Sequence, residues 1–100
     1  KYEEFFEPFE ISLVKPLDGT TSNYWLNAII LDNLTDRDLF LEFTNEQGVM
    51  TRPIWQLMNK LPMFKDCQYD DLTNSLWLAE RVVNIPSSVP NGAPLLVSDP

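Results

Sequence analysis

The strongest strand signal in the chain is the segment Tyr24-Trp25-Leu26-Asn27-Ala28-Ile29-Ile30-Leu31. Its aromatic and β-branched side chains favour extended backbone, and it is apolar enough to form a central strand of a sheet. Upstream, residues 9–14 alternate apolar and polar side chains, which predicts a half-buried strand. Residues 16–23 contain proline, glycine and small polar side chains and predict a turn or loop. This part of the chain therefore predicts two long strands joined by a loop.

Helical patterns flank these strands. Residues 1–7 have apolar side chains at helical spacing and look like the last turns of a helix whose earlier part is missing, with Pro8 ending it. A second helix is expected from Asp36 to Gln47, after capping side chains at residues 33–35 and before Gly48. We expect its apolar face to consist of Leu39, Phe40 and Phe43.

The second half of the chain predicts shorter elements. Thr73 is expected to cap a third helix, whose apolar residues recur at the helical period: Leu72, Leu76, Ala79 and Val83. Brief strands are expected at 49–52, stopped by Pro53, and at 83–86, while 54–60 predicts a short helix or turn. Trp25 and Trp77 are expected to pack in the core.

This order of elements predicts an α+β fold. The expected architecture is a two-layer sandwich, in which a small, mainly antiparallel sheet is covered by helices on one face. One hundred residues are enough for one domain with a modest core. We expect that domain to span residues 1–89 and residues 90–100 to form a proline-rich tail that is extended or loosely ordered.

Composition excludes several kinds of function. The net charge of −8 argues against nucleic-acid binding, and no apolar run is long enough to cross a membrane. The sequence has no histidine, which removes His-based metal sites and Ser-His or Cys-His nucleophile pairs. The single cysteine, Cys67, favours a reducing cytoplasm. We expect no metal and no membrane partner, and we expect that this chain alone is not a complete enzyme.

One segment differs in charge from the rest. Residues 49–65, which we call the cationic strip, hold three of the chain's seven basic residues and no acid: Arg52, Lys60 and Lys65. The strip also contains two prolines and a tryptophan. A cationic, apolar, proline-stiffened segment on an acidic protein indicates a surface for a ligand that is anionic and partly apolar. The alternative is a connection that packs in the core with its charges pointing to water.

Four blocks in the same order carry a resemblance to a known family: Asn23-Tyr24-Trp25-Leu26-Asn27-Ala28-Ile29-Ile30-Leu31, Gly48-Val49-Met50-Thr51-Arg52-Pro53-Ile54-Trp55, Leu57-Met58-Asn59-Lys60-Leu61-Pro62-Met63-Phe64 and Arg81-Val82-Val83-Asn84-Ile85-Pro86-Ser87-Ser88. Over residues 1–89 the chain resembles the C-terminal domain of the DegT-type nucleotide-sugar aminotransferases. The branch it is most similar to acts on 4-keto sugars in nonulosonate (legionaminic acid) synthesis.

The resemblance implies a pyridoxal-phosphate enzyme of fold type I. Such enzymes move an amino group, usually from glutamate, to the keto carbon of a nucleotide-linked sugar, and they work as dimers with sites at the subunit interface. Their catalytic lysine and most cofactor contacts belong to a large N-terminal domain that is absent from these residues. The implied partners are this N-terminal domain, a second subunit and the nucleotide-sugar substrate.

The resemblance also implies that the cationic strip helps to wall the substrate pocket. Arg52 is then the candidate for a charge-assisted contact with an oxyanion, and Trp55 for a flat wall beside a ring. Asn59 and Lys60 complete the expected substrate-binding set. Asn59 stands where many relatives carry histidine, a departure consistent with a different substrate. The structural alternative for Arg52 is a salt bridge to an acid elsewhere, either Glu46 or Asp32.

Two further hypotheses remain open from the sequence. The chain could be a stand-alone binding or interaction module without a cofactor. It could also be a small enzyme that uses the paired carboxylates Asp70 and Asp71, a weaker hypothesis that requires a pocket around them.

Overall fold

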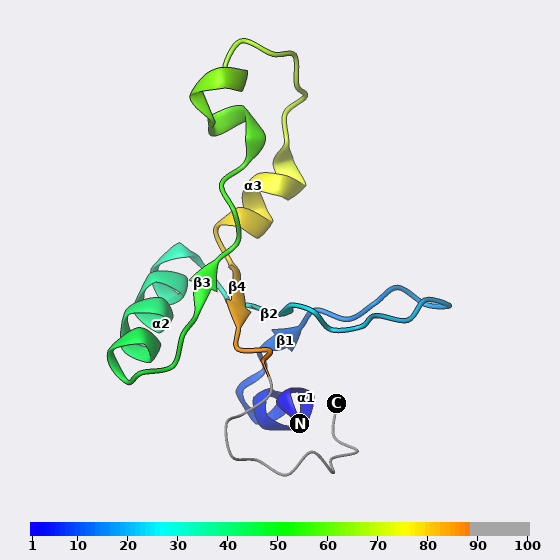
Figure 1. The fold of residues 1–100 in the computed structure, drawn as a ribbon, viewed down its shortest axis with the longest axis vertical. Helices are drawn as coiled ribbons and strands as arrows, with labels where there is room; N and C mark the ends of the chain where they lie inside the picture. The colour runs from blue at the N-terminus through cyan, green and yellow to red at the C-terminus, as the bar shows by residue number, and fades with distance from the viewer. Residues whose placement is uncertain (89–100) are drawn as a thin grey trace.

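The structure, a computed structural model, describes residues 1–88 and shows a small antiparallel sheet with helices around it (Figure 1). The strands are β1 (Ser12–Leu13), β2 (Asn27–Ile30), β3 (Arg52–Pro53) and β4 (Val82–Ile85). They lie in the order β1-β2-β4-β3, and each neighbouring pair is antiparallel. The predicted α+β class is therefore confirmed. The expected tail, residues 90–100, lies outside the described residues.

The core lies against one face of the two central strands. Ile29 of β2 and Val83 of β4 are cross-strand partners, and neither has measurable exposure. Side chains from helix α1 (Tyr2–Phe6) and helix α2 (Leu34–Glu46) pack against this pair, among them Phe6 and Phe40. Both helices therefore contribute to the same buried cluster, as the expected two-layer arrangement requires.

Both N-terminal strands are shorter than the sequence predicts. Strand β2 begins at Asn27 rather than Tyr24, because Tyr24 adopts a left-handed backbone with φ of 53°. The Ser22 hydroxyl accepts a hydrogen bond from the Tyr24 amide, so local side-chain bonding replaces the sheet ladder there. Strand β1 begins late because a 3-10 turn at Glu7–Phe9 is followed by a left-handed residue, Glu10.

Helix α2 confirms the predicted caps but not the predicted apolar face. The Asn33 side chain accepts a hydrogen bond from the amide of Asp36 at 2.8 Å, and Gly48, with φ of 83°, follows the helix end. Leu39 and Phe43 are 60% and 63% exposed, so the expectation that they form the buried face is wrong. The inward side instead holds residues at i, i+3, i+4 and i+7 spacing: Arg37, Phe40, Leu41 and Thr44.

Between β3 and β4 the chain leaves the sheet and returns, forming a lobe at residues 54–79 that projects from it (Figure 1). The lobe contains 3-10 turns at Met58–Lys60 (η2) and Pro62–Phe64 (η3), followed by helix α3 (Thr73–Ala79). The radius of gyration, 15.8 Å, exceeds the roughly 13 Å typical of a compact chain of this length. Val83, expected to extend the apolar face of the third helix, lies in β4 instead.

The expectation that Trp25 and Trp77 pack in the core is also wrong. Trp25 is 71% exposed and Trp77 is 47% exposed. Trp25 follows the turn at residues 22–24, where its amide is bonded by the Asn23 side chain at 3.0 Å rather than by a neighbouring strand. Aromatic residues in the sequence were therefore an unreliable guide to burial in this chain.

Candidate functional site

The cationic strip runs along the surface, so it is not the core-packing connection that was its alternative. Its only buried residue is Thr51, whereas Arg52, Trp55 and Lys60 are exposed. Arg52 lies in β3, Trp55 in the segment that leaves the sheet, and Asn59 and Lys60 in η2. The strip thus runs from an edge strand of the sheet into the part of the lobe that lies beyond α3 (Figure 1).

The guanidinium group of Arg52 is held by neutral acceptors. Its Nη1 atom donates to Asn45 Oδ1 at 2.9 Å and to the carbonyl of Thr51 at 2.7 Å. In residues 1–88 it forms no ion pair, so the salt bridge to Glu46 or Asp32 that was its structural alternative is absent. Arg52 is therefore fixed on one side while its positive charge stays uncompensated.

A small polar network around Thr51 supports Arg52 from beneath. Thr51 is 2% exposed, and its hydroxyl lies 2.6 Å from the hydroxyl of Thr44 on α2. The Asn45 amide donates to Thr51 Oγ1 at 3.0 Å, and Thr44 Oγ1 donates to the Phe40 carbonyl at 2.8 Å. Each buried polar atom of this network thus has a partner, which is the condition for such a cluster to be rigid. Sequence reasoning did not identify these residues as part of the site.

Three cations outside the strip form ion pairs with carboxylates, and the cations of the strip do not within the described residues. Lys15 pairs with Glu3, Arg37 with Asp38, and Arg81 with Glu80. By contrast, none of the strip's three cations has a carboxylate partner within residues 1–88: Arg52, Lys60 and Lys65. On a protein of net charge −8, cations without a carboxylate partner are the charges of the described chain that are most available to attract an anion.

Two further side chains of the strip have properties suited to contacting a ligand. Trp55 exposes 81% of its surface, which makes a flat apolar area available beside the cations. Asn59 is half-buried, and its Oδ1 atom is shielded from solvent without a hydrogen-bond partner in the described residues. A buried acceptor left unpaired is costly, so a donor from a bound group would satisfy it.

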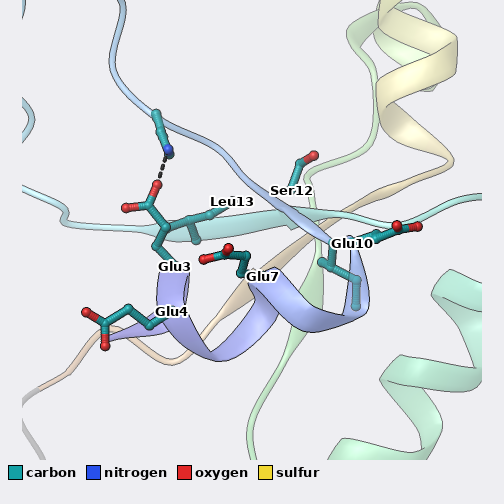
Figure 2. A pocket seen from close by; sticks show the side chains of 8 residues that line it. Glu3, Glu4, Glu7, Glu10, Ser12 and Leu13 are labelled. Carbon is teal, nitrogen blue, oxygen red and sulfur yellow. Dashed lines mark ion pairs between the residues drawn. The ribbon is translucent and has the colours of Figure 1, made fainter.

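A hollow outside the cationic strip is acidic. It is a groove of about 520 Å³ between α1 and β1, with four glutamates along it: Glu3, Glu4, Glu7 and Glu10 (Figure 2). Its one cation, Lys15, is bonded to Glu3, and this pair lowers the pKa of Glu3 and raises the pKa of Lys15. A second hollow of about 180 Å³ is lined by residues of 14–28. None of the four predicted site residues lines either hollow.

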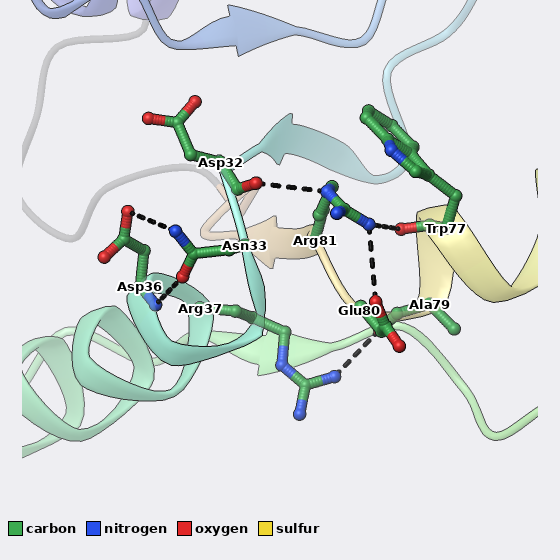
Figure 3. A network of polar contacts seen from close by, with 8 residues as sticks. All are labelled: Asp32, Asn33, Asp36, Arg37, Trp77, Ala79, Glu80 and Arg81. Carbon is green, nitrogen blue, oxygen red and sulfur yellow. Dashed lines mark hydrogen bonds and ion pairs between the residues drawn. The ribbon is translucent and has the colours of Figure 1, made fainter.

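Two arginines tie the lobe to the rest of the domain at the end of α3 (Figure 3). Arg81 donates from Nε to the Asp32 carbonyl at 3.1 Å and from Nη1 to the Trp77 carbonyl at 3.0 Å, and its guanidinium lies 4.4 Å from the centroid of the Trp77 ring. Arg37 of α2 donates to the Ala79 carbonyl at 2.8 Å. These cations satisfy carbonyls at the negative end of α3 and so fix the lobe relative to the sheet.

The residues present do not build a site for the pyridoxal phosphate that the resemblance implies. A Schiff-base lysine needs a lowered pKa in a desolvated setting. The chain's lysines are all exposed, and the ion pair with Glu3 raises the pKa of Lys15. None of these lysines is therefore suited to bind the cofactor as a Schiff base.

The paired carboxylates Asp70 and Asp71 have a structural use. Asp70 Oδ1 accepts a hydrogen bond from the Leu72 amide at 2.8 Å, and Asp71 Oδ1 accepts one from the Thr73 amide at 3.4 Å. Both side chains are exposed and lie outside the two hollows. They stabilise the start of α3, where backbone amides need acceptors.

Comparisons with known proteins bear on the family of the chain. No helix among the described residues is long and apolar enough to span a membrane. A search of curated proteins found no match. Residues 1–91 match the DegT/DnrJ/EryC1/StrS aminotransferase family, whose members are generally dependent on pyridoxal phosphate. Because this match covers nearly the whole chain, the protein belongs to the DegT/DnrJ/EryC1/StrS aminotransferase family.

Proposed function

We propose that this chain is the C-terminal small domain, residues 1–89, of an aminotransferase that transfers an amino group from glutamate to a keto sugar carried on a nucleotide. On this proposal the enzyme is a cytoplasmic dimer, and its substrate belongs to the nonulosonate (legionaminic acid) branch. The N-terminal domain supplies the lysine and the pyridoxal phosphate. The small domain supplies one wall of the substrate pocket and part of the interface with the catalytic domain and the second subunit.

The observation that carries the proposal is the uncompensated charge of the cationic strip. A nucleotide sugar presents a diphosphate beside an apolar base and a sugar ring. Arg52, anchored through one nitrogen, is suited to contact a phosphate oxygen with its remaining N–H groups. Trp55, 81% exposed, is suited to pack against a ring. The acidic groove at α1 would repel the same ligand, which favours the strip as the contact surface.

Two more residues complete the proposed contact set. The unpaired Oδ1 of Asn59 is an acceptor for a hydroxyl or amide donor of the substrate. Lys60 adds positive charge on η2 and attracts the diphosphate without requiring a fixed geometry. The proposal assigns these residues binding and orientation of the substrate and gives none of them a catalytic role.

Steady-state kinetics of the full-length protein test the proposal. A charge-assisted contact contributes about 1.5–3 kcal/mol, so Arg52→Ala should raise KM for the nucleotide sugar roughly 10- to 100-fold and leave KM for glutamate nearly unchanged. Lys15→Ala, which removes a cation outside the strip, is the matched control. Equal changes in both KM values for Arg52→Ala would remove Arg52 from the sugar pocket.

The same measurement distinguishes the proposal from a stand-alone binding module. Such a module would have no transaminase activity in its complete natural form, and the gene would encode no lysine-bearing catalytic domain upstream of Lys1.

A further inference from the structure

We propose that Asn45 is a positioning residue, which sets the direction in which Arg52 presents its guanidinium to an oxyanion of the ligand. The inference rests on the proposed function, because it requires that Arg52 contacts the substrate. It adds a residue at the end of α2, outside the cationic strip, to the determinants of binding.

The hydrogen bonds of Asn45 fix its side-chain amide in one orientation. Its Nδ2 atom donates to the Leu41 carbonyl at 2.7 Å, the Thr51 hydroxyl at 3.0 Å and the Thr51 carbonyl at 3.2 Å. Because all of these oxygens can accept and the two carbonyls cannot donate, the amide nitrogen must face them. The Oδ1 atom is thereby turned toward Arg52 and accepts a hydrogen bond from its Nη1 atom at 2.9 Å.

This arrangement leaves a defined edge of Arg52 for a ligand. Both hydrogen bonds that its guanidinium makes within residues 1–88, to Asn45 Oδ1 and to the Thr51 carbonyl, use Nη1. In residues 1–88 the Nε and Nη2 atoms have no partner, and these two nitrogens form the edge that grips an oxyanion in parallel hydrogen bonds.

The chemical identity of residue 45 also matters for charge. An asparagine amide accepts the hydrogen bond without neutralising the guanidinium, whereas a carboxylate at the same position would form an ion pair with it. An ion-paired Arg52 would attract an anionic ligand less strongly. The structure thus combines a fixed arginine with an unreduced positive charge, a combination that asparagine provides and aspartate does not.

The expected effects can be measured in the full-length protein with the nucleotide-sugar substrate. Asn45→Ala removes the hydrogen bond that orients Arg52, so the substrate must order the guanidinium when it binds. This entropic cost should raise KM for the sugar roughly 2- to 10-fold. The kcat and the KM for glutamate should stay unchanged. Asn45→Asp, which keeps the size and an acceptor, should raise KM for the sugar at least as much. Asn74→Ala, at an exposed asparagine of α3, is the matched control.

A double-mutant cycle separates positioning from general structural support. In an Arg52→Ala background, Asn45→Ala should cause no further rise in KM for the sugar, because there is no guanidinium left to orient. A further rise of the same size as in the wild type would show that Asn45 acts through Thr51 and the fold, and would overturn the inference. Melting temperatures of all variants identify any loss of folding, and Asn45→Asp provides the test if Asn45→Ala unfolds.

Failure of this inference and failure of the proposed function give different results. If Arg52→Ala raises KM for the sugar and Asn45→Ala and Asn45→Asp do not, the positioning role is refuted and the proposed function stands. If Arg52→Ala itself leaves KM for the sugar unchanged, the contact between Arg52 and the substrate is refuted, and the positioning role is refuted with it.

Discussion

The substitution Arg81→Ala should loosen the lobe without unfolding the sheet. Arg81 bonds the Asp32 carbonyl at the end of β2 and the Trp77 carbonyl in α3, and it covers the ring of Trp77. Its side chain is 19% exposed. Removing it therefore breaks a connection between the lobe and the sheet, while the bond from the Leu31 amide to the Arg81 carbonyl survives.

The magnitude follows from the contacts that are lost. Each of the two carbonyl hydrogen bonds contributes about 1 kcal/mol net, and the stacking on Trp77 contributes about 0.5–1 kcal/mol. The contact with Glu80 at 3.4 Å is solvent-exposed on the acid side and contributes little. The sum is about 2.5–3 kcal/mol, which corresponds to a roughly 70- to 160-fold increase in local opening.

Hydrogen exchange measures this opening under native conditions. In the full-length protein, amides of α3 should lose roughly 70- to 160-fold in protection in Arg81→Ala, while amides of β2 and β4 change less. Lys65→Ala removes an exposed lobe cation that has no ion pair within residues 1–88 and should change protection by less than about 0.5 kcal/mol. Equal protection of α3 in Arg81→Ala and in wild type would refute the anchoring role.

Three further predictions test the fold, and the first includes a control substitution. Ile29→Ala, at a site with no exposure, should destabilise the domain by about 2–5 kcal/mol in a thermal or urea melt, whereas Leu39→Ala, at a 60% exposed site, should change stability by less than about 0.5 kcal/mol. Gly48→Ala should lower the free energy of unfolding by about 1 kcal/mol, because alanine is strained in the left-handed backbone at this position. No steric clash adds to this cost, since a Cβ there meets nothing within 4 Å. Glu3 has a lowered pKa, so its pair with Lys15 stabilises the fold above pH 4.5 and is lost as the pH falls through the lowered value. The raised pKa of Lys15 makes the same contribution disappear above pH 10.5, and Lys15→Met should flatten stability at both limits.

Local sequence patterns predicted which elements form, but they did not predict where the strands begin or which face of α2 is buried. The capping of α2 by Asn33 and its end before Gly48 are local effects, and both were predictable. The choice of Phe40 over Leu39 for the core was not, because both are apolar and the sheet alone determines which side of the helix it meets. The late start of β2 depends on left-handed backbone at Tyr24, which the residue type does not favour.

The candidate site was predictable in its charge but not in its support. The absence of acids from residues 49–65 was visible in the sequence, and the uncompensated cations follow from it. Asn45 and Thr44 could not be assigned in advance, because polar residues at the end of a helix are common and ordinarily face solvent. Their role depends on the turn after α2, which brings Thr51 back against the helix so that its hydroxyl meets both side chains.

The arginines of the described domain differ in how far along the sequence their hydrogen-bond partners lie and in whether a carboxylate pairs with them. Arg37 and Arg81 donate to carbonyls 42 and 49 residues away, and each also contacts an adjacent carboxylate, so they join distant elements with their charge reduced. Arg52 bonds only to residues 7 positions and 1 position away, and it has no carboxylate partner within residues 1–88. Joining distant elements therefore does not account for Arg52, whose exposed side chain is ordered by two hydrogen bonds to neutral acceptors and keeps its full charge. On the proposed function an anionic ligand pairs with that charge, so loss of Arg52 should be detected in substrate affinity, while loss of Arg81 should be detected in hydrogen exchange.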